Sequence, residues 1–477
     1  MSTLSKSAQV RARLDHPVID SDGHTVEYIP AVLDYMKEIG GARMPERFTS
    51  GGADYYGRQR WYRASAAERH KSRMMRPPWW AVAAKNTLDR ATATLPKLLH
   101  ERLDEIGLDF TVLYPTLRPS EIVEDAELRG VACRAYNMFH RDAFFEYSDR
   151  MTPAAVIPMY TPQEALDELE YAVRTLGFKA VLLTSYVRRP ISDGSGSWLD
   201  FFGIDSEYDY DPVWAKCVEL GVAPSFHSAG MGWGSRVSIS NYMYNHIGHF
   251  ASAAEALAKS LFLGGVTRRF PSLRFAFLEC GVAWACALYS DLIGHWQKRN
   301  GDAVLNYDPT RLDRELFASL CERYGGRVME NGRLEQAVKG AGIATDSRED
   351  PSALDEYARC GISKKEDIRD LYVPNFFFGC EADDPTNAWA FDSRRLPFGV
   401  RLNAIFSSDI GHWDVPDMTE VVDEAYELVE HGAITPDDFR DFVFTNPVKL
   451  WTAMNPDFFK GTVVEGYAAK LMKPGPT

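Results

Sequence analysis

The stretch RFAFLECG, residues 274–281, reads as a short apolar strand that ends in a carboxylate, Glu279, and a glycine. A short, uninterrupted apolar run is typical of a strand buried on both faces, as in a parallel sheet. A charge at the tip of such a strand could cap a helix beginning at Val282. It could also be one of several polar groups gathered at one edge of a sheet, so the other strands decide between the two interpretations.

Eight apolar runs along the chain predict strands, and helix-period segments separate most of them. The runs are VID (18–20), DFTVLYPT (109–116), MTPAAVIPMY (151–160), GFKAVLLTSY (177–186), VAPSFHSAG (222–230), RFAFLECG (274–281), VPNFFFGCE (373–381) and LNAIFSSDIGH (402–412). Strands that alternate with helices predict a parallel sheet. Eight such units favour a closed (β/α)8 barrel of the TIM type over the alternative, a doubly wound open sheet.

Two long excursions, at about residues 31–108 and 296–372, interrupt this pattern. We interpret both as helical and loop insertions of the kind that form lids or oligomer contacts. The predicted organisation is an N-terminal arm over residues 1–16, the barrel over 17–455 and a C-terminal tail over 456–477.

Composition limits the classes of function. The net charge of -14 argues against nucleic acid or an anionic membrane as the main partner. No apolar run reaches the length of a membrane span, and the N-terminus has no signal-type apolar segment. Seven cysteines without a CxxC pair predict free thiols in a reducing compartment, so we expect a cytoplasmic protein.

The predicted strands end in polar residues. In a TIM-type barrel the catalytic groups lie at the C-terminal ends of the strands. The side chains found there are Asp22 and His24 after the first strand, His227 after the fifth, Glu279 after the sixth, and Asp409 with His412 after the eighth. Singly, an aspartate could make a turn or cap a helix, and a histidine could lie in the core. Together they predict a divalent transition-metal site.

At these residues the chain resembles the amidohydrolase superfamily, in the branch that includes the aminocarboxymuconate semialdehyde decarboxylase-like enzymes. The resemblance covers about residues 17–30 and 150–455. It is carried by IDSDGH (19–24), SFHSAG (225–230), GGVTRRFPSLRFAFLECG (264–281), FSSDIGHWDVPD (406–417) and TNPVKLW (445–451). It implies a metal-dependent barrel, usually a homodimer.

The resemblance assigns roles to individual residues. Asp22 and His24 stand where the family has a His-x-His pair, and His227 matches its metal histidine on the fifth strand. Asp409 matches an aspartate that binds metal and can act as a base, and His412 could orient it. The chain departs from the family in having Asp22 instead of histidine, no lysine at the tip of the fourth strand, and Glu279 where decarboxylase-type relatives have a catalytic histidine.

The departures make the predicted site rich in carboxylates. As a ligand, Glu279 would give three carboxylates, enough with the histidines for two ions; otherwise it could act as an acid or base. NHIGHF (245–250) adds His246, a predicted ligand of a second metal, and His249 on the same face of a predicted helix. This ligand set resembles that of diiron proteins. Some members of the branch resemble non-haem diiron monooxygenases of terpenoid biosynthesis.

Three functions therefore compete. The first is O2-dependent hydroxylation of a bulky apolar, terpenoid-like molecule at two Fe ions, with the aromatic PPWWAV and PNFFFG segments as further support. The second is metal-dependent hydrolysis or non-oxidative decarboxylation of a small organic acid with Zn or Mn, in which Asp409 and Glu279 supply acid–base chemistry. The third is a non-catalytic binding barrel. Tyr114, Arg118 and Trp413, near predicted strand tips, could line the pocket for a small-molecule substrate.

Overall fold

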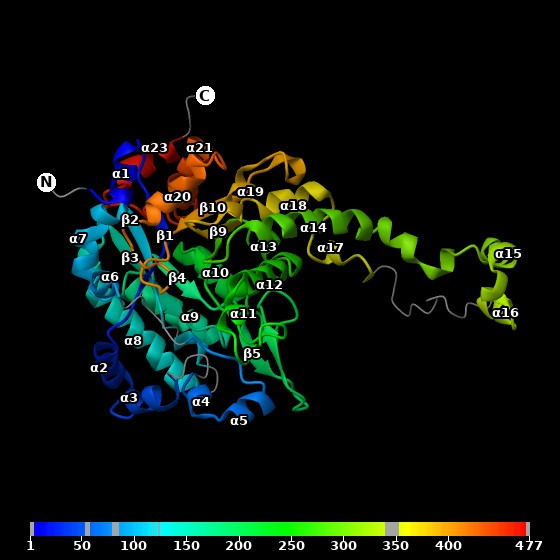
Figure 1. Cartoon of the computed structure of the whole chain (residues 1–477), viewed down its shortest axis with the longest axis horizontal. Helices are drawn as coiled ribbons and strands as arrows, with labels where there is room; N and C mark the ends of the chain where they lie inside the picture. Colours follow the sequence, from blue (N-terminus) through cyan, green and yellow to red (C-terminus); the bar gives the residue numbers. More distant parts are fainter. Residues whose placement is uncertain are drawn as a thin grey trace. The chain divides into compact units, whose positions relative to one another are not determined.

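The computed structural model describes residues 4–52, 58–78, 85–117, 119–122, 125–338 and 353–473. Eight parallel strands form one sheet in the order β1-β2-β3-β4-β7-β8-β9-β10, with helices around it (Figure 1). The strands are β1 (Ile19–Thr25), β2 (Phe110–Pro115), β3 (Met151–Ile157), β4 (Ala180–Leu183), β7 (Pro224–Phe226), β8 (Phe275–Phe277), β9 (Phe376–Glu381) and β10 (Asn403–Ser407). The predicted (β/α)8 barrel is confirmed.

The first and last strands of the sheet meet at their C-terminal ends. The backbone N–H of Asp409 donates to the carbonyl of Asp22 at 3.0 Å, and the N–H of His24 donates to the carbonyl of Ile410 at 2.8 Å. We call this junction of β1 and β10 the seam. The seam closes the barrel by joining its first and last strands at the end where the polar residues lie.

The strands are buried because helices cover the outside of the barrel. Every residue of β1, β2, β3, β4, β7 and β8 is buried, which explains their continuous apolar runs. The covering helices include α7 (Pro96–Ile106), α8 (Ala126–Phe144), α9 (Pro162–Glu170), α10 (Asp211–Leu220), α12 (His249–Leu263), α13 (Val266–Arg269), α19 (Ala388–Phe391), α20 (Val421–Glu430), α21 (Pro436–Arg440) and α22 (Asn446–Met454). Helix α14 (Ala283–Arg299) follows β8 in the chain. Local sequence signals mark where these helices begin. In α9, for example, the side chain of Thr161 accepts from the backbone N–H of Glu164, and Pro162 lies in the first turn.

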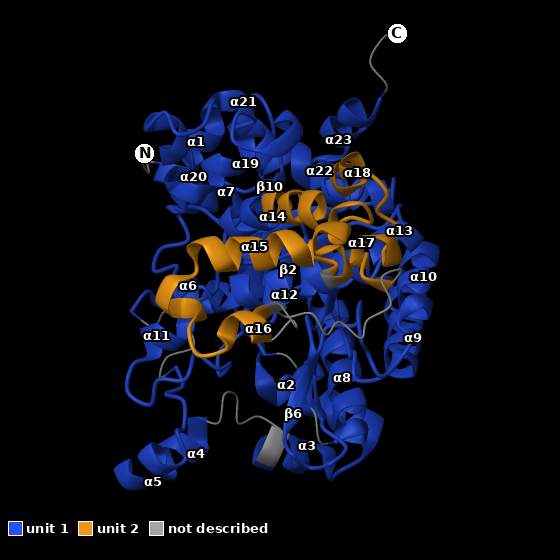
Figure 2. Ribbon diagram, turned by 90° about the vertical axis from the view of Figure 1, so that its right-hand side faces the viewer, with its two compact units in different colours: residues 1–288, 371–477 blue, residues 289–370 orange. Residues whose placement is uncertain are grey.

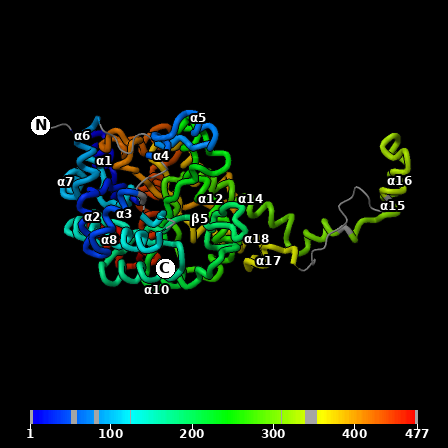
Figure 3. The backbone as a smooth tube through the Cα atoms, turned by 90° about the horizontal axis from the view of Figure 1, so that it is seen from below, coloured from blue at the N-terminus to red at the C-terminus, as the bar shows by residue number. Residues whose placement is uncertain are grey.

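The first excursion is helical where the structure describes it. It contains α2 (Ile29–Gly40), α3 (Met44–Arg47), α4 (Arg58–Arg63), α5 (Ala66–Lys71) and α6 (Thr87–Thr92). Helix α2 lies beside the barrel helix α8 (Figure 3). Val32 and Met36 of α2 pack with Leu128, Ala132 and Tyr136 of α8. This part of the insertion therefore shares a core with the barrel. Trp79 and Trp80 of the PPWWAV segment lie outside the described residues.

The chain separates into two compact units, residues 1–288 with 371–477, and residues 289–370 (Figure 2). The second unit corresponds roughly to the second excursion and contains α15 (Arg314–Tyr324), α16 (Arg333–Val338) and α17 (Glu356–Arg359), while α18 (Lys365–Tyr372) crosses the boundary. Within it α15 packs against α16.

The ends of the described chain are helical. In the N-terminal segment, α1 (Lys6–Arg13) packs on α20, and the N–H of Ser7 donates to the carbonyl of Thr419 at 3.2 Å. In the C-terminal segment, α23 (Glu465–Met472) follows the barrel. Among the described residues, no helix combines the length and the apolar character needed to cross a membrane.

Two features differ from the sequence-based expectation. An antiparallel hairpin, β5 (Val187–Pro190) and β6 (Ser197–Asp200), follows β4 and was not predicted. The phenylalanines of PNFFFG are at most 3% exposed in β9. They therefore belong to the core, and they give no support to an aromatic substrate pocket.

Candidate metal centre

The tip of β1 carries two of the predicted ligands, Asp22 and His24, on a bulged strand. The pairing of β1 with β2 shifts register between Asp20 and Gly23. A bulge turns side chains away from the regular alternation of a strand. Both side chains are almost completely buried and face the same centre: His24 Nε2 lies 3.4 Å from Asp22 Oδ1.

The two carboxylates that follow β8 and β10, each two residues past the end of the strand, share an unusual backbone conformation. Glu279 has φ = 48° and Asp409 has φ = 51°, a left-handed region that residues other than glycine seldom adopt. Each stands two positions before a glycine that also has positive φ, Gly281 and Gly411. A Cβ on Gly411 would lie 2.6 Å from the carbonyl oxygen of His24. Such strain is typical of functional sites.

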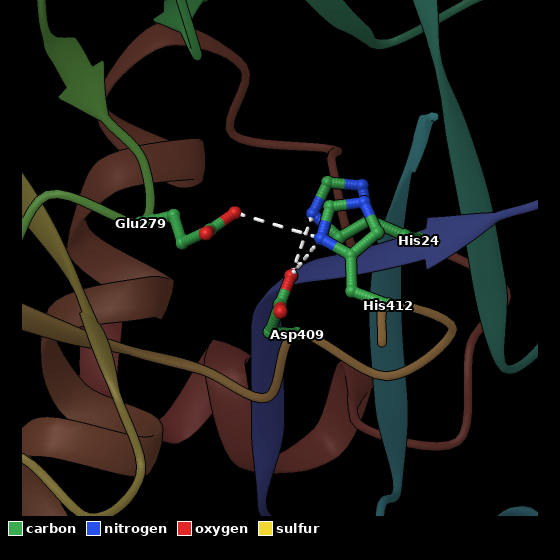
Figure 4. Close-up of side chains that lie close together, drawn as sticks. All are labelled: His24, Glu279, Asp409 and His412. Carbon is green, nitrogen blue, oxygen red and sulfur yellow. Dashed lines mark ion pairs between the residues drawn. The ribbon is translucent and has the colours of Figure 1, made fainter. Parts of the chain in front are cut away.

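The side chains converge at the mouth of the barrel. Asp409 Oδ1 lies 3.1 Å from His24 Nε2 and 2.6 Å from His412 Nδ1 (Figure 4). The rings of His24 and His412 stack at 3.6 Å. Glu279 Oε2 lies 2.9 Å from His227 Nε2 and 3.6 Å from His412 Nδ1. The carboxylate at the end of RFAFLECG therefore belongs to a cluster of histidines and carboxylates.

The cluster fits a divalent metal. Among the described residues, two groups of side chains could each hold a metal ion, because the ligand atoms within each group lie within 4.8 Å of one another. The groups are His24–Glu279–Asp409–His412 and Asp22–His24–His227, and they share His24. Imidazole nitrogens with carboxylate oxygens suit Zn, Mn and Fe. Five of the six side chains are at most 5% exposed, and burying so many charged groups is costly unless they are paired or bind a metal.

The surroundings shift the two strained carboxylates in opposite directions. Burial raises the pKa of Asp409 well above its ordinary value, and the negative charges of Glu279 and Asp414 raise it further. Burial acts to raise the pKa of Glu279 as well, but the hydrogen bonds from His227 and His412 outweigh it and hold that pKa well below its ordinary value. The surroundings therefore favour the charged form of Glu279 more than that of Asp409.

A cavity of about 350 Å³ opens beside the cluster, with Glu279 in its wall. Its other lining residues lie outside the two ligand groups. They are His246, Ile247, Gly248, His249, Phe250, Ala251, Cys280, Gly281, Glu381, Asp384, Trp413 and Asp414. We call this the outer wall. Its volume is at the lower end of the range for small-molecule sites.

His246 and His249 do not lie on one helix, and that prediction is wrong. Helix α11 (Tyr242–His246) ends at His246, and α12 begins at His249. Gly248, with φ = 70°, separates the helices. The two rings nevertheless lie 4.6 Å apart in the outer wall. The described geometry places neither histidine in a ligand group, so a metal-binding role for His246 stays a prediction.

The residues predicted to line the pocket lie at different places. Trp413 lines the cavity, with its ring 5.7 Å from that of His246. Tyr114 is completely buried with its ring 6.4 Å from that of His24, and its hydroxyl donates to Ser225 Oγ at 3.2 Å. Arg118 lies outside the described residues.

Sequence reasoning missed three carboxylates of the outer wall, Glu381, Asp384 and Asp414. A signal for Glu381 existed, because it ends the seventh predicted strand just as Glu279 ends the sixth. Asp384 and Asp414 lie in loops beyond strands, where the sequence does not indicate which side chains turn toward the barrel axis.

The comparisons with known proteins agree with this architecture. The amidohydrolase family matches residues 96–325. An amidohydrolase from Mycobacterium avium subsp. paratuberculosis is 16% identical, covers 92% of this chain and 100% of its own, and has a TM-score of 0.50. A 2,6-dihydroxybenzoate decarboxylase from Rhizobium is 14% identical (92% and 99% covered, TM-score 0.47). A dihydroxybenzoic acid decarboxylase from Polaromonas, solved with bound manganese, is also 14% identical (93% and 99%, TM-score 0.47). No curated protein matches the chain.

Residues 96–325 therefore match the amidohydrolase family, and the resemblance inferred from the sequence motifs is confirmed. At such low identities, the likeness to solved structures concerns the fold alone.

Proposed function

We propose that this protein is a metal-dependent hydrolase of the amidohydrolase type, acting on a small neutral or cationic molecule. The observation that carries the proposal is the pair of overlapping ligand groups at the barrel mouth, next to a cavity of suitable size. Asp22, His24, His227, Glu279, Asp409 and His412 would hold the metal. A bound divalent ion would lower the pKa of a water molecule to about 7 and polarise the bond to be cleaved.

The chain's own groups suit proton transfer. Asp409 Oδ1 is the candidate base, because it contacts both His24 Nε2 and His412 Nδ1 within the cluster of potential ligands. His412 Nδ1, 2.6 Å away, holds that carboxylate in place and can take a proton from it. Glu279 is held as an anion by two histidines, so it suits a ligand better than an acid.

The charge of the outer wall bears on the substrate. Glu381, Asp384 and Asp414 line the cavity together with Glu279, and its described lining contains no Lys or Arg. Burial lowers the pKa of His246, so its ring adds little positive charge near neutral pH. A carboxylate substrate would meet the like charges of Glu279, Asp384 and Asp414 here, whereas Glu381, whose pKa is raised to about 8, adds little charge at neutral pH. This favours hydrolysis of a neutral or cationic molecule over decarboxylation of an acid.

A second candidate is O2-dependent hydroxylation with two Fe ions. The specific observation in its favour is that three carboxylates and three histidines divide into two groups sharing His24, which is enough donors for two ions. Carboxylate-rich sets of this kind are used by diiron proteins. The family match favours hydrolysis.

Elemental analysis of protein purified without added metal or a chelating step separates the candidates. One zinc or manganese ion per chain supports hydrolysis; two irons per chain together with oxygen uptake would overturn it. Neutral and cationic esters, lactones and amides should then be screened in H2¹⁸O. A hydrolase incorporates the label from water, whereas an oxygenase incorporates it only from ¹⁸O2. The homodimer stays a prediction, which light scattering can test.

A further inference from the structure

One buried carboxylate close to the metal cluster has no role in the proposed chemistry. Asp20 is completely inaccessible, and both of its oxygens accept two hydrogen bonds. Oδ1 accepts from the backbone N–H groups of Asp22 at 3.1 Å and Ser408 at 2.9 Å. Oδ2 accepts from the hydroxyls of Thr111 at 2.7 Å and Ser408 at 2.8 Å.

These four bonds tie three segments together. Asp20 lies in β1, Thr111 in β2, and Ser408 directly after β10. Ser408 immediately precedes Asp409, and Asp20 lies two residues before Asp22. The Asp20 carboxylate therefore spans the seam just below the backbone bonds that join Asp22 and His24 to the Asp409 segment.

Where β1 is bulged, its regular backbone pairing with β2 is interrupted, and the Asp20 carboxylate makes hydrogen bonds at this point instead. The register of β1 shifts between Asp20 and Gly23. A Cβ on Gly23 would lie 2.7 Å from Asp20 Oδ2 and 2.8 Å from Thr111 Oγ1. The bulge therefore accommodates the Asp20 side chain only because residue 23 is glycine.

We propose that Asp20 is a positioning residue of the metal centre, which sets the separation of Asp22 and Asp409 across the seam and thereby the metal affinity. Partners that orient metal ligands commonly change affinity 10- to 100-fold when they are removed. The inference rests on the proposed metal centre, and one of its tests needs no metal.

Two hydroxyl deletions form a matched pair. Ser408→Ala and Thr111→Val each remove one donor to the same oxygen, but only Ser408 lies across the seam; its hydroxyl also accepts from the N–H of Ile410. Mn²⁺ binding to the full chain is followed by the EPR signal of the free ion. We expect Ser408→Ala to weaken binding about tenfold and Thr111→Val to leave it nearly unchanged. Equal affinities in the two variants would overturn the proposal.

Substitutions of Asp20 itself give the second comparison. In Asp20→Asn the amide oxygen still accepts from both N–H groups, and the amide nitrogen can donate to both hydroxyls after they rotate. This variant should keep most of the Mn²⁺ affinity, whereas Asp20→Ala should lose about 100-fold. An Asp20→Ala protein that folds and binds Mn²⁺ like the wild type contradicts a positioning role. If it does not fold, the Ser408/Thr111 pair decides.

Hydrogen exchange on the metal-free protein separates this inference from the proposed function. Amides of residues 405–413 should exchange faster in Ser408→Ala than in Thr111→Val, because only the former loosens the seam. If the wild type takes up no Mn²⁺, the metal proposal fails while exchange still tests Asp20. Equal exchange in the two variants would overturn the role of Asp20 whatever the metal content.

Discussion

The barrel mouth has two kinds of carboxylate, those of the two ligand groups, which we call the inner cluster, and those of the outer wall. The two kinds differ in burial, backbone conformation and side-chain contacts. Glu279 and Asp409 are buried, adopt left-handed backbone conformations and each contact two histidines. Glu381 and Asp414 of the outer wall line the cavity, and neither has positive φ. The inner groups are constrained before any ligand arrives, as metal binding requires, whereas the outer groups remain free to adapt to a substrate.

The largest expected effect is a difference in metal content between two variants, one lacking an inner carboxylate and the other lacking an outer one. Glu279→Ala should lose one metal ion per chain, because Glu279 belongs to a ligand group. Glu381→Ala should keep the wild-type ion count. Elemental analysis of both proteins checks the pair. Unchanged metal in Glu279→Ala would remove the basis for a dinuclear centre.

A pair of histidines, one from a ligand group and one from the outer wall, tests the same difference in metal binding with a smaller expected effect. His227→Ala should weaken Mn²⁺ binding at least about tenfold, because His227 lies in a ligand group. His246→Ala should change it little, because His246 lies outside both groups. A titration followed by EPR measures both. Should His246→Ala lose an ion, His246 would be a ligand of a second metal, as predicted from the sequence.

The backbone strain should appear in stability. At Glu279, a glycine variant should be more stable than an alanine variant by about 1 kcal/mol in the metal-free protein, because alanine keeps the cost of positive φ. The same pair at Glu381, in a regular strand, should show the reverse, with glycine less stable by about 0.5–1 kcal/mol. Urea unfolding compares the four variants. A glycine that destabilises at both positions would mean that Glu279 is unstrained.

The smallest expected effect is a pH dependence in the outer wall. Burial, together with the negative charges of Glu279 and Asp414, raises the pKa of Glu381 to about 8. In the unfolded chain the pKa of a glutamate is about 4.3. Because the pKa of Glu381 is higher in the folded state, its contribution to stability is fully present below about pH 4.3 and is lost as the pH rises through 8.

Glu381→Gln removes this titration. The melting temperature of the metal-free wild type should therefore fall relative to that of Glu381→Gln between about pH 4.3 and 8, and the difference should level off above pH 8. A difference that is constant with pH would show that Glu381 titrates normally. Bound metal should shrink the effect, because a cation favours the ionised carboxylate.

Much of the fold and part of the site followed from local sequence. The barrel could be predicted because strands buried on both faces leave continuous apolar runs, as in RFAFLECG, and because helices separate them. Asp22, Glu279 and Asp409 could be predicted to lie together because parallel strands bring their C-terminal ends to one edge. The segments ECG and DIG, each ending in a glycine of positive φ, held a further sign of tight turns there.

The remaining features depended on the tertiary structure, because they join residues far apart in the chain. Asp20 meets Ser408 across 388 positions, and no local pattern indicates that a carboxylate closes the barrel at that point. The break at Gly248 moved His246 and His249 into the outer wall, and the closed barrel placed Asp384 and Asp414 beside Glu381. The sequence by itself determined which residue types end the strands. Only the closure of the barrel decided which of them contact one another, because those contacts depend on the register and seam of the whole sheet.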